Sequence, residues 1–303
     1  MLRLGLRPHL RSEPKIRRCR PLLGTFVEIT ASGNAWHRLG LNPALDLPSR
    51  CSAFHEAVDA AFAAMKKIQN MMSAHDPASE LSLLNREAAH RIVTVSRETY
   101  EVLRRADRMA VESKGAFDYT VAPTLARWGL LPATLQCENA GNWRDVLLLR
   151  RRQVRFLRPL TLDLGGIAKG FAVDQAIEVL REHGVASAMV NAGGDLRVFG
   201  AQSSRIHLRH PSQPQQFAHR IELAQAALAT SSPCFTEKNL HGQRVSHLVD
   251  SIRQTAVTGV ISVSVRAQEC WLADALTKVV LNAPQLAQKM LAKYGAEAFV
   301  LTA

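Results

Sequence analysis

The stretch that most constrains the fold is residues 162–200, which read LDLGGIAKGFAVDQAIEVLREHGVASAMVNAGGDLRVFG. From Lys169 onward the apolar residues recur at helical spacing, and Gly184 ends the pattern as helix-terminating glycines do. A strand, a glycine turn and a second strand follow over 186–200. A helix followed directly by paired strands favours a domain in which helices pack on a sheet.

The first residues of this stretch suit the binding of a phosphate. Gly165 and Gly166 let a backbone approach a ligand closely or adopt positive φ. Lys169 offers a point charge, and the helix that begins there has free N–H groups that favour an anion. The alternative is a tight strand-to-helix turn with a solvated lysine, because glycine-rich turns are common without any such ligand.

Apolar periodicity extends over the rest of the chain. Helical spacing marks 52–72 and 97–115, and alternation marks a first strand at 25–30. QVRFL and TLDL are expected to be strands before the central helix, and the last third alternates strand patterns before two helices and a final strand. We therefore expect an α/β fold of the α+β type, with mixed and antiparallel sheets and flanking helices. A mobile basic arm is expected over 1–19, and a single domain over 20–303.

The charge of the chain favours an acidic partner. Its 303 residues include 38 basic and 26 acidic ones, giving a net charge of +12, which suits nucleic acid, an anionic membrane or a phosphorylated ligand. Nucleic acid is not expected, because aromatic residues make up only 6% of the chain and cannot supply a base-stacking platform. The basic run at 149–158 is expected to be a turn and an edge strand with solvated arginines.

The cysteines and the N-terminus indicate a cytoplasmic protein. Five cysteines lie far apart, without a CxxC pair, as is typical of a reducing compartment. The N-terminal residues lack the apolar core of a secretory signal. No stretch reaches the roughly 18 continuous apolar residues of a membrane span, so no transmembrane segment is expected.

Eight stretches occur in the order typical of one family and run from residue 20 to residue 279. They are RPLLGTFVEI (20–29), MSAHDPASELSLLN (72–85), GAFDYTVAPTLARWG (115–129), LDLGGIAKGFAVDQAIEVLREHGV (162–185), VNAGGDL (190–196), ATSS (229–232), SHLVD (246–250) and ADALTKV (273–279). In these stretches the chain resembles the ApbE family of FAD:protein FMN transferases. The resemblance implies that it binds FAD and Mg²⁺, splits the pyrophosphate, transfers FMN to a Ser or Thr hydroxyl of an acceptor flavoprotein and releases AMP.

The resemblance also implies roles for particular residues. His247 and Asp250 are implied as the acid/base pair that activates the acceptor hydroxyl, a task that suits the ordinary pKa of histidine. The implied Mg²⁺ ligands are the Ala168 carbonyl, Asp274 and Thr277. The residues implied to line the nucleotide site are Met72, Ser79, Glu80, Asp118, Thr120, Asp163, Gly165, Gly166, Lys169, Gly193, Gly194, Asp195, Thr230 and Ser231.

Several of these residues also have a purely structural interpretation. Met72 can belong to the core, and Asp118 can cap the turn before Pro123. Asp195 can serve the β-turn beside its glycines, and His247 can be a structural histidine on its strand.

The chain departs from the family pattern in two places. The family continues with a Pro-x-Thr-Gly turn, but here Ser251 follows Asp250 and no Thr-Gly occurs at the expected distance, which affects either the acceptor side of the site or the transfer step. The family places a threonine four residues after the metal-binding aspartate, but here Lys278 takes that position after Asp274. Two arrangements are open, because positions i+3 and i+4 both neighbour position i on a helix. Either Thr277 completes a metal site, or the Lys278 ammonium pairs with Asp274 where the metal belongs.

These departures leave three hypotheses. The first is an active FAD:protein FMN transferase, and the second is a divergent member of the family that binds FAD without efficient transfer. The third, a basic RNA-binding protein, accounts for the charge but for none of the glycine motifs.

Overall fold

A seven-stranded antiparallel sheet organises the computed structural model, which describes residues 15–32, 47–138, 140–201, 203–234, 236–240 and 242–303. The strand order is β1-β2-β6-β7-β10-β15-β16, and every neighbouring pair is antiparallel. The strands are β1 (Lys15–Leu22), β2 (Thr25–Ser32), β6 (Ser187–Ala192), β7 (Asp195–Phe199), β10 (Ala227–Ser231), β15 (Ile261–Ala267) and β16 (Glu297–Thr302). The α+β fold with antiparallel sheets is therefore confirmed.

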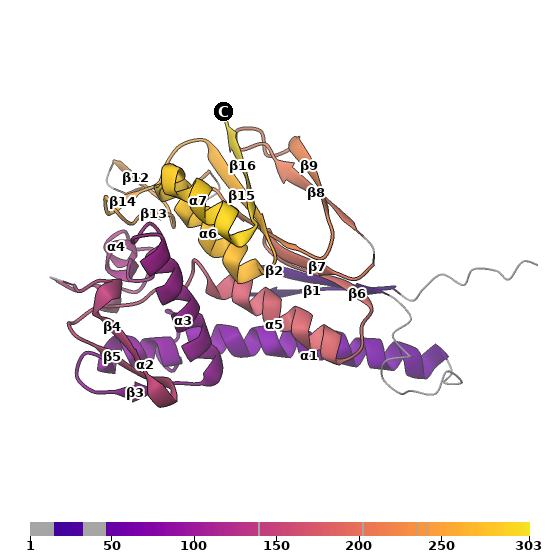
Figure 1. Cartoon of the computed structure of the whole chain (residues 1–303), viewed down its shortest axis with the longest axis horizontal. Coiled ribbons are helices and arrows are strands. Elements are labelled where there is room, and N and C mark those ends of the chain that lie inside the picture. The colour runs from indigo at the N-terminus through magenta and orange to yellow at the C-terminus, as the bar shows by residue number, and fades with distance from the viewer. Residues whose placement is uncertain (1–14, 33–46, 139, 202, 235, 241) are drawn as a thin grey trace, which may run out of the picture.

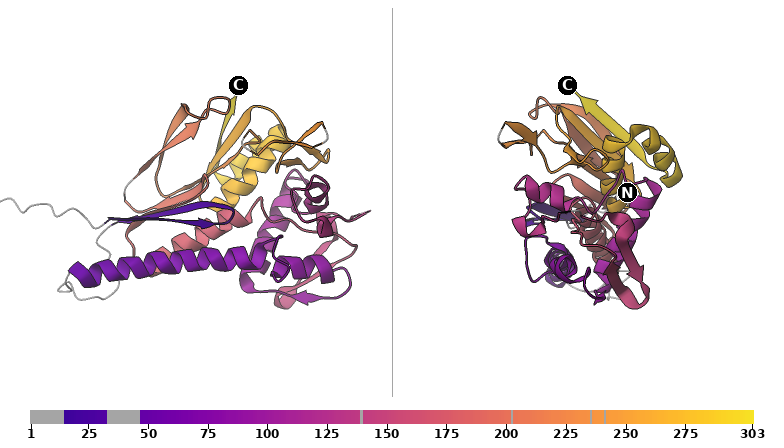
Figure 2. Two further views of the ribbon diagram at one scale, coloured as in Figure 1. Left: turned by 180° about the vertical axis from the view of Figure 1, so that it is seen from behind. Right: turned by 90° about the vertical axis from the view of Figure 1, so that its left-hand side faces the viewer.

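Helices cover one face of this sheet (Figure 1). Helix α5 contacts β6 and β7, and α6 contacts β10 and β15, while the long α1 runs alongside α5 (Figure 2). The helices are α1 (Leu47–Met72), α2 (Glu80–Glu87), α3 (Arg97–Glu112), α4 (Ala122–Arg127), α5 (Ala168–Glu182), α6 (Cys270–Asn282) and α7 (Pro284–Tyr294). Within the described residues, none of these helices has the length and apolar character needed to span a bilayer.

Strand β7 shows how the sequence divides between two cores. Its residues alternate, so that Phe199 joins the main core beneath the helices while Leu196 and Val198 join a smaller core on the opposite face. The hairpin of β8 (Ser204–Arg209) and β9 (Phe217–Leu223) covers that smaller core. Because both faces of β7 are packed, all five of its residues are buried.

Smaller sheets and 3-10 turns surround this framework. The 3-10 turns lie at 133–135, 143–145 and 150–152. The additional strands are β3 (Val93–Thr94), β4 (Val146–Leu149) and β5 (Gln153–Phe156) in one sheet, the pair β11 (Lys238–Leu240) and β12 (Gln243–Val245), and the pair β13 (Val249–Asp250) and β14 (Thr255–Ala256).

The basic N-terminal segment differs from the expected mobile arm. Residues 1–14 lie outside the described residues, but residues 15–19 belong to β1 rather than to an arm. Arg18 lies 3.0 Å from the Asp59 carboxylate on α1, and the Arg20 guanidinium stacks 4.6 Å from the Phe62 ring centroid. The basic residues of β1 are thus held against α1, and the strand returns into β2 through a two-residue turn at Leu23 and Gly24 with positive φ at both positions.

Two other expectations about strands require correction. TLDL (161–164) is not a strand, because its backbone N–H groups donate to the Tyr119 carbonyl and the Asn85 side chain, which are distant in sequence, rather than to a neighbouring strand. The basic run contains β5, which pairs with both β3 and β4 and is therefore central in its sheet rather than an edge. The arginines of the adjoining turn at 150–152 are exposed, as expected.

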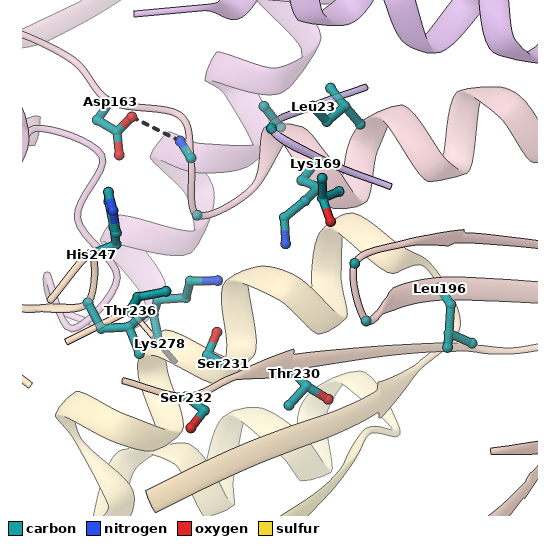
Figure 3. Close-up of a pocket in the computed structure, with 18 of the residues that line it drawn as sticks. Leu23, Asp163, Lys169, Leu196, Thr230, Ser231, Ser232, Thr236, His247 and Lys278 are labelled. Carbon is teal, nitrogen blue, oxygen red and sulfur yellow. Dashed lines mark hydrogen bonds between the residues drawn. The ribbon is translucent and has the colours of Figure 1, made fainter. Parts of the chain in front are cut away.

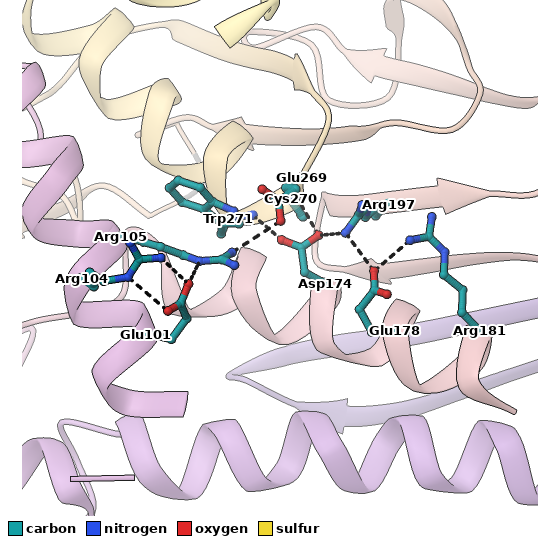
Figure 4. Close-up of polar contacts among 10 residues, drawn as sticks. All are labelled: Glu101, Arg104, Arg105, Asp174, Glu178, Arg181, Arg197, Glu269, Cys270 and Trp271. Carbon is teal, nitrogen blue, oxygen red and sulfur yellow. Dashed lines mark hydrogen bonds and ion pairs between the residues drawn. The ribbon is translucent and has the colours of Figure 1, made fainter. Parts of the chain in front are cut away.

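A buried carboxylate joins α5 to α6 (Figure 4). Asp174 accepts hydrogen bonds from the backbone N–H groups of Cys270 and Trp271, each at 2.9 Å, and from the Arg197 guanidinium at 2.7 Å. Residue 170 of α5 is glycine because an added Cβ would lie 2.5 Å from the Cys270 carbonyl oxygen. These contacts fix the start of α6, the helix that carries Asp274, Thr277 and Lys278.

Candidate functional site

A cavity of about 1300 Å³ opens where the glycine turn before α5 faces the β6–β7 turn, β10 and α6 (Figure 3). Ligand sites typically occupy about 300–1,000 Å³, so this cavity has room for a ligand of dinucleotide size. The expected site residues that line it are Met72, Asp118, Asp163, Gly165, Gly166, Ala168, Lys169, Gly193, Gly194, Thr230, Ser231 and His247.

The first glycine turn is organised by Asp163. Its carboxylate accepts the Gly165 N–H at 3.2 Å, and its own N–H donates to the Tyr119 carbonyl at 2.9 Å. The Ile167 and Ala168 N–H groups then both donate to the Leu164 carbonyl, which begins α5. The turn therefore presents Gly165 and Gly166 to the cavity immediately before the helix.

Lys169 links this turn to the second glycine turn. Its ammonium forms an ion pair with the buried Asp195, which follows Gly193 and Gly194 and also accepts the Thr230 N–H at 3.3 Å. Burial alone would lower the pKa of Lys169, but the Asp195 and Asp274 carboxylates raise it above its ordinary value. Lys169 is therefore a stable cation on the cavity wall.

The second turn requires glycine for a reason of packing and conformation. Gly193 has φ +64° and faces the Thr25 side chain of β2 so closely that a Cβ would overlap it. Gly194 has φ +104°, an added Cβ there would have no neighbour within 4 Å, and its N–H donates to the Asn191 amide oxygen at 2.9 Å. Gly194 thus leaves open space beside the cavity.

His247 stands on the cavity wall between β12 and β13, with its ring directed toward Asp163 (Figure 3). Loss of hydration lowers its pKa below the ordinary value, and the charge of Lys238 acts in the same direction. The Asp163 carboxylate opposes this shift. The imidazole is consequently neutral at pH 7 and able to accept a proton.

Asp250 does not lie with His247. It is absent from the cavity lining and accepts hydrogen bonds from the Ile252 and Arg253 N–H groups, at 3.0 and 2.9 Å, and from the Arg253 guanidinium at 2.7 Å. Burial would raise the pKa of Asp250, but these donors hold it below its ordinary value. The structure thus places Asp163, rather than Asp250, toward the histidine.

The segment after Asp250 closes into a short hairpin despite the missing proline. The Ser251 hydroxyl donates to the Gly115 and Ala116 carbonyls, at 2.6 and 3.0 Å. The Asn282 amide of α6 donates to the Ala116 and Val249 carbonyls, at 2.9 and 3.0 Å. Serine therefore anchors this side of the cavity through hydrogen bonds that proline lacks.

Asp118 and Thr120 form a local pair at the cavity. Asp118 accepts the N–H and hydroxyl of Thr120, at 2.7 and 2.6 Å, and burial raises the pKa of its carboxyl. Thr120 does not line the cavity itself, so its contribution is to orient Asp118. Met72 both lines the cavity and belongs to the main core.

Ser79 and Glu80 lie outside the cavity lining and connect helices instead. The Ser79 hydroxyl caps α2 by accepting the Ser82 N–H at 3.0 Å. Glu80 accepts the N–H and hydroxyl of Ser96, the N-cap residue of α3, at 3.1 and 2.7 Å. Their contacts in the structure are those of helix capping.

The three residues expected to bind metal are only partly brought together. Ala168 lines the cavity, but Asp274 and Thr277 are buried behind it. The Lys278 ammonium forms an ion pair with Asp274, so the second of the two open arrangements is the one observed. Among the residues that the structure describes, no group of three or more His, Cys, Asp or Glu side chains could hold a metal ion.

Other cavity residues were not assigned from the sequence. His75 lies in the MSAHDP stretch, and its interaction with His247 acts to lower the pKa of His247. Thr25 and Asn191 contact the second glycine turn. All three lie within the family-like stretches, but only their position in the fold distinguishes them from neighbouring residues.

Comparisons with known proteins identify relatives of this chain. A family model described as the ApbE family matches residues 23–300. A FAD:protein FMN transferase of Vibrio cholerae is 29% identical over 232 residues, covering 70% of this chain and 69% of the relative. One of Treponema pallidum is 29% identical over 254 residues, covering 73% of this chain and 70% of the relative.

Solved structures show the same fold. The ApbE protein of Thermotoga maritima superposes with a TM-score of 0.81 at 25% identity, covering 95% of this chain and 94% of that one. The flavinyl transferase ApbE of Pseudomonas stutzeri superposes with a TM-score of 0.77 at 20% identity, covering 97% and 93% of the two chains. At that lower identity the likeness concerns the fold alone.

Proposed function

The chain belongs to the ApbE family, whose model matches residues 23–300, and from this premise we propose that it is an FAD:protein FMN transferase. The curated relatives carry that name. The observation that carries the proposal is one cavity in which two glycine turns, the Lys169 ammonium and a neutral His247 face the same space.

FAD is the substrate that this cavity suits. The turns at 165–166 and 193–194 leave backbone close to the space where a dinucleotide would lie. Lys169 supplies positive charge for the pyrophosphate, and Thr230 and Ser231 on β10 also line the cavity and provide hydroxyls. Met72 and Asp118 also line the cavity, where the nucleotide would contact an apolar and a polar side chain.

The proposed reaction passes FMN to a Ser or Thr hydroxyl of an acceptor flavoprotein. The hydroxyl oxygen bonds to the phosphorus on the FMN side, and the bond from that phosphorus to the bridging oxygen breaks. AMP leaves with that oxygen, and His247 takes the hydroxyl proton. Asp163 would stabilise the imidazolium so formed, because its carboxylate already raises the pKa of His247.

Five of the expected site residues that do not line the cavity have supporting positions in this proposal: Ser79, Glu80, Thr120, Asp195 and Asp250. Asp195 holds Lys169, and Thr120 holds Asp118. Asp250 shapes the hairpin next to His247 through its contacts with residues 252 and 253. A direct acid/base role for Asp250 stays a prediction from the family resemblance, and it would require Asp250 to release Arg253.

Binding of Mg²⁺ stays an expectation, and the side chains around Asp274 do not fit it. Mg²⁺ demands about six oxygen ligands in near-octahedral geometry. Here an ammonium rather than a hydroxyl stands four residues after Asp274 and forms an ion pair with its carboxylate. No step of the proposed reaction is therefore assigned to a metal ion.

The second candidate is a family member that binds FAD without efficient transfer. The ion pair between Asp274 and Lys278 favours it, because an ammonium compensates a carboxylate but does not act as a Lewis acid.

A cytoplasmic setting is part of either proposal. Cys19, Cys137, Cys234 and Cys270 are free thiols, as is usual in a reducing compartment.

One experiment separates the two candidates. The purified chain is incubated with FAD and a pool of Ser- and Thr-containing peptides, and AMP and FMN-bearing peptides are followed by chromatography and mass spectrometry. Release of AMP together with a peptide adduct, both lost in His247→Asn, would support the transferase. Stable binding of FAD with neither product would favour the binding protein instead.

A further inference from the structure

Lys278 is built into the wall of the cavity rather than left on its surface. Its stem runs beside the first glycine turn, where a Cβ on Gly166 would lie 3.4 Å from the Lys278 Cε. Its ammonium forms an ion pair with the Asp274 carboxylate and donates to the Asp274 carbonyl at 3.1 Å. Only 19% of the lysine side chain is exposed, so the glycine turn and the lysine occupy complementary space.

The groups that would bind a metal ion already have partners. One Asp274 oxygen is taken by Lys278, and the other accepts the Gly170 N–H at 3.3 Å. The Thr277 hydroxyl donates to the Asp274 carbonyl at 2.6 Å and lies 2.7 Å from the Ser231 hydroxyl. To bind here, a divalent ion would have to displace the Lys278 ammonium from the Asp274 carboxylate. It would also have to break the hydrogen bonds of Asp274 and Thr277.

The charges around the turn balance without a metal ion. Lys169 neutralises Asp195, and Lys278 neutralises Asp274. Both carboxylates are 1% exposed, so each needs a cation within direct contact. The two lysines reach from α5 and α6 toward the same part of the cavity, near Ser231 (Figure 3).

We propose that Lys278 is the resident cation of this nucleotide site, so that the chain binds the pyrophosphate of FAD without a divalent metal ion. This inference rests on the proposed function, because it concerns the same cavity and the same ligand. One ammonium brings a single positive charge where a divalent ion would bring two. The wild-type site therefore holds the pyrophosphate less strongly than a metal-loaded site but holds it in the presence of a chelator.

The test compares FAD binding in Mg²⁺ and in EDTA by isothermal titration calorimetry. Wild-type protein is expected to have the same dissociation constant in both buffers. In Lys278→Thr, which restores a hydroxyl four residues after Asp274, affinity in EDTA is expected to fall about tenfold and to recover with Mg²⁺. The matched control is Lys289→Thr on α7, an exposed lysine outside the cavity lining, and it should behave like the wild type.

A second readout follows the metal directly. Mn²⁺ is titrated against protein and FAD while the signal of free Mn²⁺ is recorded by electron paramagnetic resonance, with FAD alone as the blank. The wild type should leave this signal at the blank level, whereas Lys278→Thr should reduce it. Mn²⁺ uptake by the wild type would overturn the inference even if the variant failed to fold.

The outcomes distinguish this inference from the proposed function. Wild-type binding of FAD that requires Mg²⁺ would overturn the role of Lys278 and leave the transferase proposal intact. Equal binding by Lys278→Thr in both buffers, without loss of affinity, would also overturn it. Failure of the wild type to bind FAD in either buffer would reject the proposed function and, with it, the inference.

Discussion

At the scale of single residues, the surroundings of His247 govern its readiness to accept a proton, and loss of hydration has the largest effect on its pKa. Loss of hydration lowers the pKa of His247, and Lys238 lowers it further, whereas Asp163 raises it. Burial in turn raises the pKa of the Asp163 carboxyl, and the Gly165 N–H opposes that change. Loss of hydration, Lys238 and Asp163 therefore together determine the pH at which the imidazole loses its proton.

We predict that Asp163→Asn moves the acid limb of AMP release to lower pH. Transfer needs neutral His247, and removal of the nearby negative charge disfavours the imidazolium, so the pKa falls further below its ordinary value. The pH profile of AMP release and the imidazole resonances of His247 measure this shift. Asp59→Asn, which alters a carboxylate paired with β1, is the control and should leave the limb in place. A limb that stays fixed or moves upward in Asp163→Asn would contradict the assignment.

The sequence predicted the backbone of the site better than its side chains. Gly165, Lys169 and Gly193 line the cavity, in or next to glycine turns whose form depends on local sequence. Asp250 does not, because a residue only three positions away, Arg253, captures its carboxylate. A sequence motif does not specify from which of several nearby donors a carboxylate accepts its hydrogen bonds. The roles of the expected site residues therefore stay predictions.

At the scale of elements, Asp174 substitutes for a missing helix cap. The N-cap residue of α6, Glu269, makes no side-chain capping hydrogen bond. Asp174 on α5 instead accepts the first N–H groups of α6, where a negative charge also interacts favourably with the helix dipole. Burial raises the pKa of Asp174 to about 6, while Arg197 and the two N–H groups act to lower it.

We predict that Asp174→Asn destabilises the fold by about 3–5 kcal/mol, the usual cost of breaking a buried ion pair from one side. Arg197 would remain buried without its buried carboxylate partner. Chemical denaturation followed by circular dichroism measures the loss. The matched control is Glu178→Gln, because Glu178 lies 3.7 Å from the same guanidinium but is 48% exposed, and its change should cost less than about 1 kcal/mol. Equal losses in the two variants would show that burial of Asp174 does not matter.

The elements that the sequence missed owe their form to distant partners. TLDL (161–164) alternates like a strand, but the Leu162 N–H donates to the Asn85 side chain at 2.7 Å instead of to a neighbouring strand. The first residues of β1 were expected to belong to a mobile basic arm, but Asp59 and Phe62 of α1 contact its arginines. The longer helices were expected from the sequence, because their apolar residues recur at helical spacing over many positions; these are α1, α3, α5, α6 and α7.

At the scale of the whole molecule, the cavity depends on segments from both ends of the chain. Its lining runs from Cys19 to Asn282, so no part of the chain could build it alone. The order of motifs predicted that the fold spans nearly the whole sequence, and the family match over residues 23–300 agrees. The contacts that join distant helices were not predictable, because single charged residues on exposed helix faces look alike in sequence.

Glu112 makes one of these contacts. It lies near the end of α3 and accepts the Tyr294 hydroxyl of α7 at 2.6 Å, with Lys293 at 2.9 Å and Arg108 at 3.0 Å. Burial would raise the pKa of Glu112, but these three donors lower it to about 2. The contact connects residues 182 positions apart in the sequence.

The low pKa of Glu112 predicts a specific acid sensitivity. Because the folded pKa lies below the unfolded value of about 4.5, the stabilisation is complete above that value and disappears as the pH falls toward 2. Because solvent screens the partly exposed partners, we expect Glu112→Gln to be less stable than the wild type by only about 1 kcal/mol at pH 7, and the difference to shrink between pH 5 and pH 2. Urea unfolding across this pH range measures it. Glu222→Gln, which alters an exposed pair with Arg205, should change stability little at any pH. A Glu112→Gln deficit that persists unchanged at pH 2 would mean that shape rather than charge joins α3 to α7.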